Sequence, residues 1–253
     1  MRAAAGGNAG HTGDMRPWLR ERVADAGRDA WATLLPTECS GCGVLDRALC
    51  IACREGLLPK VHPVVRGDAV IWAALTYEGS ARHVIAAYKD GGRTDALAAL
   101  AVPLRAAIVA ALAAVPAEAA DSAALSNSDS PSNICLVTIP SSRGAFRVRG
   151  YHPVDMLLGR AGLRPFSALT LCAETVDQVG LDRAARAANK NNSLVARRSL
   201  EHTRIILVDD IVTTGASLLE ARRAVFAAGG TVVGLATLAE TRLRQPGPGH
   251  RSS

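Results

Sequence analysis

The sequence predicts an α/β fold in which a mostly parallel β-sheet is flanked by helices, with a small four-cysteine element near the N-terminus. Strand and helix patterns alternate from residue 134 to residue 238, which is the order that parallel sheets wrapped by helices show. Residues 205–208 are four consecutive apolar residues, typical of a buried strand. The chain has 253 residues and a hydrophobic fraction of 49%, enough for one domain with a sizeable core.

Changes in composition along the chain predict its organisation. Residues 1–35 are expected to be a disordered N-terminus with a leading amphipathic helix over 16–35. Residues 36–58 hold the cysteine cluster, and residues 59–242 form the main domain. Within that domain, residues 116–133 are polar and low in complexity, which predicts a flexible linker or surface loop. Residues 243–253 are expected to be a disordered polar tail.

The elements of the main domain follow from apolar periodicity and from Gly, Pro and Asp punctuation. Strands are expected over 70–77, 134–139, 166–172, 203–208 and 231–238, and helices over 79–88, 94–115, 151–161, 181–189 and 216–228. Thr94 is expected to cap the long Ala/Leu helix and Pro103 to bend it. Loops are expected over 140–150, 174–180 and 209–215. Since ligands bind beyond the carboxyl ends of parallel strands, the loops after residues 139, 172 and 208 are where a site is expected.

Four cysteines predict a structural metal site. Cys39, Cys42, Cys50 and Cys53 form two CxxC pairs separated by seven residues, a set that supplies four thiolates for tetrahedral Zn²⁺. Four reduced cysteines without a metal, or a disulfide switch, are the alternatives. Four thiolates leave no open position for water, so the zinc is expected to be structural.

Charge and hydropathy limit the classes of protein. The net charge is +6 and nearly all basic residues are Arg, which suits a phosphate-rich ligand or a nucleic acid, although a solvated basic surface explains the same balance. No signal peptide is expected at the N-terminus. The apolar stretch 96–115 carries Arg105 in its middle, so no membrane insertion is expected. These features predict a cytoplasmic protein.

The segment 205–217 carries the strongest chemical pattern in the sequence. Asp209 and Asp210 follow the buried strand, and as carboxylates they accept hydrogen bonds from the vicinal hydroxyls of a ribose or order Mg²⁺ and its waters. A turn rich in hydroxyl groups then enters a helix, whose N-terminus favours a phosphate. The expected 5′-phosphate loop consists of Thr213, Thr214, Gly215, Ala216 and Ser217. A strand-to-helix turn with ordinary capping residues is the alternative.

This segment resembles the phosphoribosyl pyrophosphate signature of type I phosphoribosyltransferases. The cysteine pairs, residues 77–92 (YEGSARHVIAAYKDGG), residues 140–151 (PSSRGAFRVRGY) and residues 178–192 are similar to blocks of the ComF family, also called the GntX or amidophosphoribosyltransferase-like family. The resemblance covers residues 36–242 and implies a phosphoribosyl-binding domain with a zinc element. The family often has Arg-Gly-Phe-Asn-Gln where this chain has His152 and Pro153 after Arg149-Gly150-Tyr151, which puts a role of the Asn-Gln pair in doubt.

Basic residues outside the signature are candidates for the remainder of the ligand. Lys89 and Arg143 are expected to bind pyrophosphate: Lys89 because its context matches a Lys-x-Gly block of the family, and Arg143 because it follows a strand end. In this superfamily a loop closes over the reaction centre. A lid or basic rim is therefore expected from Arg147, Arg149, Gln178, Arg183 and Arg186. For each of these side chains, a solvated surface position is the alternative.

Three functions are consistent with these residues. The first is transfer of a phosphoribosyl group from phosphoribosyl pyrophosphate, with Mg²⁺, to an unidentified base or amine. The second, which the resemblance to the ComF family implies, is a competence-type factor for DNA uptake that binds single-stranded DNA together with competence machinery, although only 4% of residues are aromatic and could stack on bases. The third is a ligand sensor that keeps the site without turnover. A homodimer is also considered.

Overall fold

The computed structural model describes residues 38–45, 47–116, 134–172 and 192–242. The predictions for the leading helix, the linker, the helix over 181–189 and the C-terminal tail lie outside these residues. The described elements are α2 (Ile51–Glu55), β1 (His62–Arg66), β2 (Ala69–Thr76), α3 (Gly79–Lys89), η1 (Thr94–Ala96), α4 (Leu97–Ala113), β3 (Ile134–Thr138), α5 (Arg143–Arg149), α6 (Pro153–Arg160), β4 (Leu169–Leu171), β5 (Leu194–Ala196), β6 (Arg204–Val212), α8 (Ala216–Ala227) and β7 (Thr231–Glu240).

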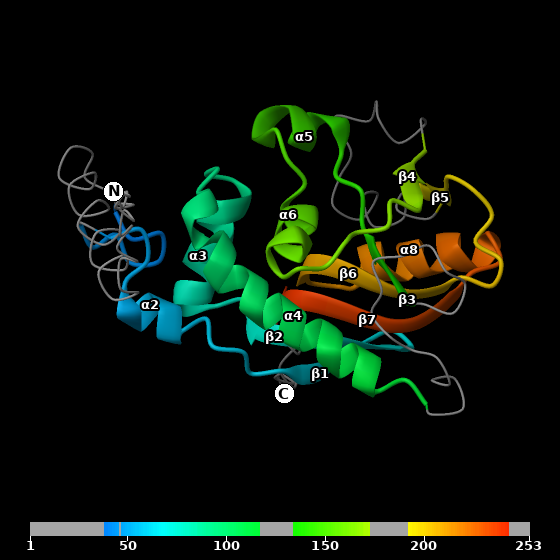
Figure 1. The fold of residues 1–253 in the computed structure, drawn as a ribbon, viewed down its shortest axis with the longest axis horizontal. Coiled ribbons are helices and arrows are strands. Elements are labelled where there is room, and N and C mark those ends of the chain that lie inside the picture. The colour runs from blue at the N-terminus through cyan, green and yellow to red at the C-terminus, as the bar shows by residue number, and fades with distance from the viewer. Residues whose placement is uncertain (1–37, 46, 117–133, 173–191, 243–253) are drawn as a thin grey trace, which may run out of the picture.

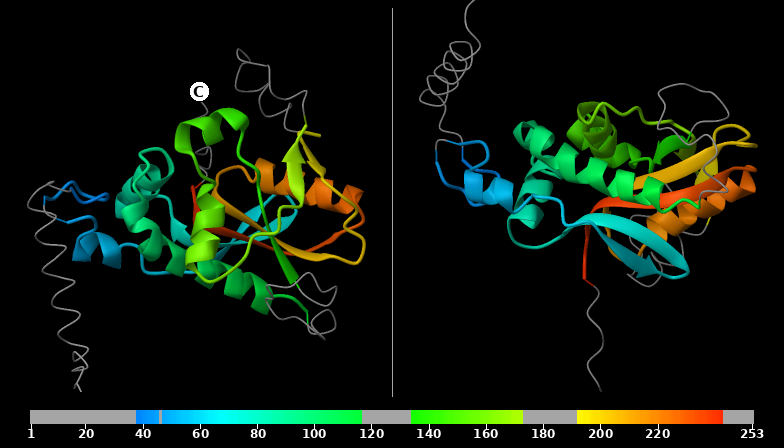
Figure 2. Two further views of the ribbon diagram at one scale, coloured as in Figure 1. Left: turned by 45° about the horizontal axis from the view of Figure 1, so that its top comes forward. Right: turned by 60° about the horizontal axis from the view of Figure 1, so that its bottom comes forward.

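The central sheet is mostly parallel, as predicted. Its strand order is β1-β2-β7-β6-β3, and only the β1–β2 pair is antiparallel. Helices α3, α4 and α6 cover one face, whereas α8 and the small β4–β5 sheet cover the other (Figures 1 and 2). β6 lies between β3 and β7, so its apolar residues are buried on both faces.

Alternation along β6 assigns its side chains to two separate cores. Ile206 and Val208 belong to the core under α3, α4 and α6, whereas Ile205 and Leu207 belong to the core under α8. Successive side chains of a strand point to opposite faces, so a buried central strand must be apolar at every position. Residues 205–208 are therefore all apolar, because helices cover each of the two faces of the sheet at this strand.

Several predicted elements were wrong in detail. Residues 140–150 are not all loop, because Ser142 caps α5 through a bond from the backbone N–H of Ala145 and Gly150 ends it at φ 74°. Residues 209–212 continue β6, because their backbone still pairs with β7 up to Glu240. Within 166–172 only β4 is strand, and it pairs with β5 in a separate antiparallel sheet.

The N-terminal part of the domain also departs from the prediction. β1 and β5 were not foreseen from the sequence. Thr94 begins the 3₁₀ turn η1 and makes no side-chain cap, so it is not the N-cap of α4. α4 runs from Leu97 to Ala113 without interruption at Pro103.

α4 is long and apolar enough to cross a membrane by composition, yet it forms part of the protein core. The stretch Thr94–Ala113 has a mean hydropathy of 2.1. Leu100, Leu104 and Ile108 on α4 are fully buried and belong to the core that α4 shares with α6, β2 and β7. A helix that packs one face in the core and exposes a charged residue, Arg105, on another is a core helix of a folded domain, which agrees with the expectation that 96–115 is not a membrane span.

Candidate functional site

The two adjacent acids lie at the carboxyl end of the central strand β6. Asp209 and Asp210 directly follow Val208 in the strand, so their side chains leave on opposite faces. Each carboxylate accepts a bond from the backbone N–H of the following residue, at 2.8 Å in both cases. The pair therefore sits on rigid, paired backbone rather than on a loop.

Asp210 is turned toward the helical layer that contains α3. Lys89, the last residue of α3, places its Nζ 2.6 Å from Asp210 Oδ2. The Lys89 side chain is 27% exposed and that of Asp210 13% exposed. The structure thus brings Lys89 to the acid pair, as a direct ion-pair partner of one member.

Asp209 keeps a proton far more readily than an ordinary aspartate. Burial disfavours its charged form and the neighbouring charge of Asp210 acts in the same direction, so its pKa rises to about 7. The backbone N–H of Asp210 and the positive charge of Lys89 oppose that rise. A sugar hydroxyl or a cation at this carboxylate would favour its ionised form.

A cavity of about 290 Å³ adjoins both acids. Its lining includes Asp209 and Asp210 at the end of β6, Lys89 at the end of α3 and Ser217 at the start of α8. Arg149, at the end of α5 in the segment after β3, lines it as well. The remaining lining residues are Ile139, Pro140, Ser141, Ser142, Ala145, His152, Pro153, Val154, Asp155 and Ile211. The cavity lies beyond the carboxyl ends of β3 and β6, where ligands of parallel sheets bind.

The predicted 5′-phosphate loop forms a second, much smaller hollow of about 20 Å³ beside the first. It is lined by Thr213, Thr214, Gly215, Ala216 and Ser217 together with Asp209, Ile211, Val212 and Leu218. Asp209 and Ser217 line both hollows, whereas Asp210 lines only the larger one. The loop opens α8 with Gly215 at φ 81°, a left-handed conformation that favours glycine.

One wall of the larger cavity is made by α5, α6 and the segment between them. Arg149 pairs with Asp90 at 3.0 Å, and the Tyr88 hydroxyl donates to the carbonyl of Pro153 at 2.7 Å. The Tyr151 hydroxyl donates to the carbonyl of Tyr88. These bonds attach the wall to the end of α3 that delivers Lys89. Arg149 therefore lines the cavity while it is paired with Asp90.

The remaining predicted rim residues, and Arg143 of the predicted pyrophosphate site, do not line the cavity or are not described. Arg147 is exposed on α5, and nothing is described for the side chain of Arg143. Gln178, Arg183 and Arg186 lie outside the described residues. His152 lines the cavity and stacks on Phe146 at 4.7 Å between ring centroids.

Sequence reasoning missed two residues that the structure brings to the site. Asp155, in the first turn of α6, accepts a bond from the Thr138 hydroxyl at 2.7 Å and lines the larger cavity. Arg66, at the end of β1, donates from Nε to the carbonyl of Thr213 at 2.6 Å. Since β1 itself was not predicted, no local pattern pointed to Arg66.

The four predicted zinc ligands meet in space. The sulfur atoms of Cys39, Cys42, Cys50 and Cys53 all lie within 4.8 Å of one another, an arrangement that fits a tetrahedral thiolate site. Burial would raise the pKa of Cys39, but backbone N–H groups directed at its sulfur outweigh burial and lower the pKa to about 6. Burial and the neighbouring sulfurs raise the pKa of Cys53. The cluster could therefore hold a metal ion, with zinc the ion that its chemistry favours.

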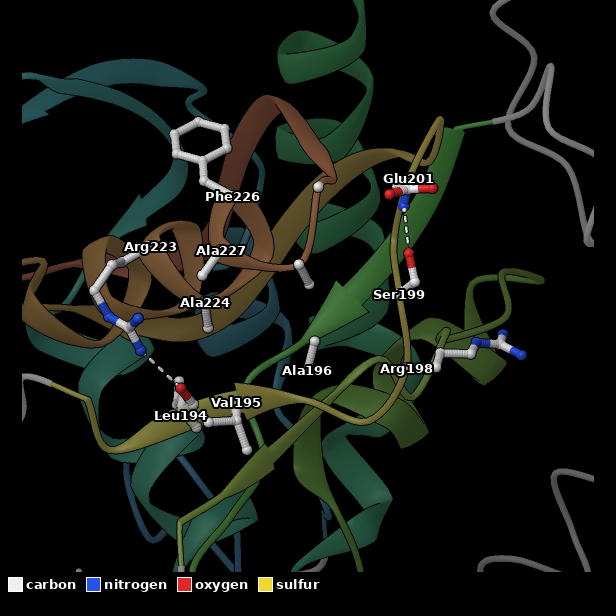
Figure 3. Close-up of a pocket in the computed structure, with 12 residues that line it drawn as sticks. Leu194, Val195, Ala196, Arg198, Ser199, Glu201, Arg223, Ala224, Phe226 and Ala227 are labelled. Carbon is white, nitrogen blue, oxygen red and sulfur yellow. Dashed lines mark hydrogen bonds between the residues drawn. The ribbon is translucent and has the colours of Figure 1, made fainter.

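Another hollow has neither acid among its lining residues (Figure 3). It measures about 700 Å³ and is bordered by α8 and by β5 and the residues that follow it. Arg223 reaches across its edge to the carbonyl of Leu194 at 2.8 Å, and Arg198 points outward at its far side. It contains none of the predicted site residues and no acid pair among its lining residues. We therefore place the candidate site at the smaller hollows beside β6.

The chain is similar to two known proteins. A protein of Caldanaerobacter subterraneus subsp. tengcongensis named orotate phosphoribosyltransferase is 32% identical over 99 residues, which are 38% of this chain and 49% of the relative. A protein of the same name from Cutibacterium acnes is 31% identical over 106 residues, 40% of this chain and 46% of the relative. This similarity supports a phosphoribosyltransferase-like protein of the type I superfamily.

The similarity covers only part of this chain and part of each relative. The chain spans about half the length of the curated relatives it matches. No family model matches the chain, so the resemblance to the ComF family stays a prediction.

Proposed function

We propose that this protein binds phosphoribosyl pyrophosphate at the end of β6 and transfers its phosphoribosyl group to a nitrogen nucleophile, releasing pyrophosphate. The observation that carries the proposal is that Asp209 lines both the larger cavity and the 5′-phosphate loop. A sugar held by the acid would thus have its 5′-phosphate within the reach of the loop.

Different residues bind different parts of phosphoribosyl pyrophosphate. Asp209 and Asp210 accept hydrogen bonds from the ribose hydroxyls, and the loop 213–217 takes the 5′-phosphate at the start of α8. Lys89 exchanges its partner Asp210 for the pyrophosphate, and Arg143 assists it. Arg147, Arg149, Gln178, Arg183 and Arg186 form the basic rim. Asp209 and Asp210 are the groups that would hold Mg²⁺ and its waters, and the bound ion would neutralise the leaving pyrophosphate together with Lys89.

The chemistry needs no nucleophile from the protein. A nitrogen of the acceptor forms a bond to C1 of the ribose as the bond from C1 to the pyrophosphate oxygen breaks, through an oxocarbenium-like state. The protein positions the two reactants and stabilises the charge on the leaving group. The acceptor is a base or an amine.

Calorimetry tests whether the ligand binds. We expect phosphoribosyl pyrophosphate with Mg²⁺ to bind the wild-type chain, and Asp209→Asn combined with Asp210→Asn to weaken binding by about a hundredfold or more, since two charged hydrogen-bond partners are lost. Asp68→Asn is the matched control, because Asp68 is an exposed acid that pairs with Arg222 and lines neither hollow of the site. A calorimetric titration of the wild-type chain that shows no heat of binding for phosphoribosyl pyrophosphate would refute the proposal.

Release of pyrophosphate separates an enzyme from a sensor. The chain is incubated with phosphoribosyl pyrophosphate, Mg²⁺ and single bases or amines, and pyrophosphate is measured. Release with at least one acceptor supports transfer. Binding without release for any acceptor would favour the sensor. The described residues give no observation that favours single-stranded DNA binding, a competence role or a homodimer, and these stay predictions, as does the cytoplasmic location.

A further inference from the structure

A buried arginine lies directly beneath the 5′-phosphate loop. Arg66 is 8% exposed, and its guanidinium donates four bonds. Nε reaches the carbonyl of Thr213 at 2.6 Å, Nη1 the carbonyl of Val65 at 3.0 Å, and Nη2 both Glu240 Oε2 at 3.2 Å and the carbonyl of Thr241 at 2.9 Å. The guanidinium therefore ties the end of β6 to the end of β7 under the loop.

The aliphatic stem of Arg66 supports the same loop from below. A Cβ built on Gly215 would lie 2.7 Å from Arg66 Cβ and 3.2 Å from Arg66 Cγ. The glycine thus lets the loop approach the arginine, in addition to allowing its left-handed conformation. The guanidinium of Arg66 thus contacts the loop at Thr213, and its aliphatic stem lies against the loop at Gly215.

We propose that Arg66 is a positioning residue that turns the amide groups of the 5′-phosphate loop toward the ligand; this inference rests on the proposed function. In a trans peptide the carbonyl oxygen and the amide hydrogen point in opposite directions, and the described residues contain no cis bond. Since Arg66 holds the carbonyl of Thr213 on the buried side, the N–H of Thr214 points to the opposite, exposed side. That side is where the phosphate would bind.

Arg66 acts through orientation rather than through its charge. Its charge is already paired with Glu240, which is 6% exposed. The planar fork of the guanidinium can bond to Thr213 and Glu240 simultaneously, whereas a lysine amine is a point charge on a flexible stem and cannot reproduce this set of directions. The Arg66→Lys variant therefore keeps the charge and loses the orientation.

Calorimetry with two probes tests the inference. Ribose 5-phosphate reports on the loop, and pyrophosphate with Mg²⁺ reports on the other end of the proposed ligand. We expect Arg66→Lys to bind ribose 5-phosphate at least about tenfold more weakly, the loss that misdirecting a charge-assisted bond gives, and to bind Mg²⁺-pyrophosphate as the wild-type chain does. Arg222→Lys is the control, because Arg222 lies on α8 and pairs with the exposed Asp68 of the β1–β2 turn.

The outcomes separate this inference from the proposed function. Equal affinity of Arg66→Lys and wild type for ribose 5-phosphate, or an equal loss for both probes, overturns the inference alone. A wild-type chain that binds neither ribose 5-phosphate nor phosphoribosyl pyrophosphate overturns both. If Arg66→Lys does not fold, the NMR resonance of the Thr214 amide in the wild-type chain tests the inference instead. We expect this resonance to shift when ribose 5-phosphate is added and not when ribose is added. A resonance that stays in place while ribose 5-phosphate binds refutes the inference.

Discussion

Two neighbouring aspartates have different environments because a strand alternates its side chains. Asp210 faces α3 and is neutralised by Lys89 at 2.6 Å. Asp209 lines the phosphate loop instead, and its pKa rises to about 7 through burial and through the charge of Asp210. Adjacent in sequence, the two acids therefore face different surroundings, and only Asp210 has a lysine in direct contact.

The raised pKa of Asp209 gives a pH-dependent stability. The folded chain binds this proton up to about pH 7, whereas the unfolded chain releases it near the ordinary value of 3.8. The contribution of this proton to the free energy of unfolding is therefore complete below pH 3.8 and is lost as pH rises through 7. We expect the free energy of unfolding of wild type, relative to Asp209→Asn, to fall by on the order of 1–3 kcal/mol between pH 5 and pH 8.

Urea unfolding at several pH values measures this difference. Asp68→Asn serves as the control, because Arg222 lowers the pKa of Asp68 and its contribution does not change in this window. A difference between wild type and Asp209→Asn that is constant from pH 5 to pH 8 would refute the raised pKa.

Lys89 should control the midpoint of that pH dependence. Its positive charge holds the pKa of Asp209 down, so Lys89→Met should move the midpoint above that of wild type. The same urea series gives the midpoint. Lys60→Met, at an exposed lysine before β1, should leave it unchanged. A midpoint that does not move on Lys89→Met would show that the ion pair is not formed in solution.

At the scale of elements, the loop before α8 depends on one glycine. Gly215 has φ 81°, and a Cβ there would lie 2.7 Å from Arg66 Cβ. We expect Gly215→Ala to lower the free energy of unfolding by about 2–4 kcal/mol, from backbone strain plus a steric overlap. Gly162→Ala is the matched control: its φ is 75° but nothing lies within 4 Å, so backbone strain alone predicts about 1 kcal/mol. Equal losses in denaturant unfolding would contradict the contact.

The cysteine element should depend on its metal. It packs on α3, where His83 Nδ1 lies 3.0 Å from the carbonyl of Gly41 and a Cβ on Gly41 would lie 3.2 Å from Val84. We expect about one zinc per chain by elemental analysis, and a lower melting temperature after chelation, because metal binding stabilises the folded state. Cys53→Ser should abolish zinc binding while Cys172→Ser keeps it. Zinc retained by Cys53→Ser would exclude the four-thiolate site.

At the scale of the whole molecule, two cores on either face of the sheet make the site rigid. α4 belongs to one core, and its Leu104 is fully buried whereas Val102 is 59% exposed. We expect Leu104→Ala to lower the free energy of unfolding by about 2–5 kcal/mol and Val102→Ala by no more than about 0.5 kcal/mol. Denaturant unfolding gives both values. Equal effects would mean that α4 is not packed on the sheet as described.

Local patterns predicted more of the site than of its surroundings. The strand over 205–208, the helix over 216–228 and the acids between them were anticipated because their signals are contiguous. The basic segment 140–150 was mistaken for loop, because its Gly and Arg residues hid a seven-residue helix that depends on the Ser142 cap. β1 and β5 were missed because short strands at or beyond the sheet edge have little apolar periodicity.

The sequence by itself determined the four clustered cysteines and the strand-to-helix segment that holds both acids and the predicted phosphate loop. All of these are encoded within a few residues of one another, so local chemistry is enough. Only the tertiary structure decided that Lys89 neutralises Asp210 and that Arg66 supports Thr213 from 147 residues away. Such partners depend on which strands become neighbours, which is set by the packing of two cores around the sheet and not by any local pattern.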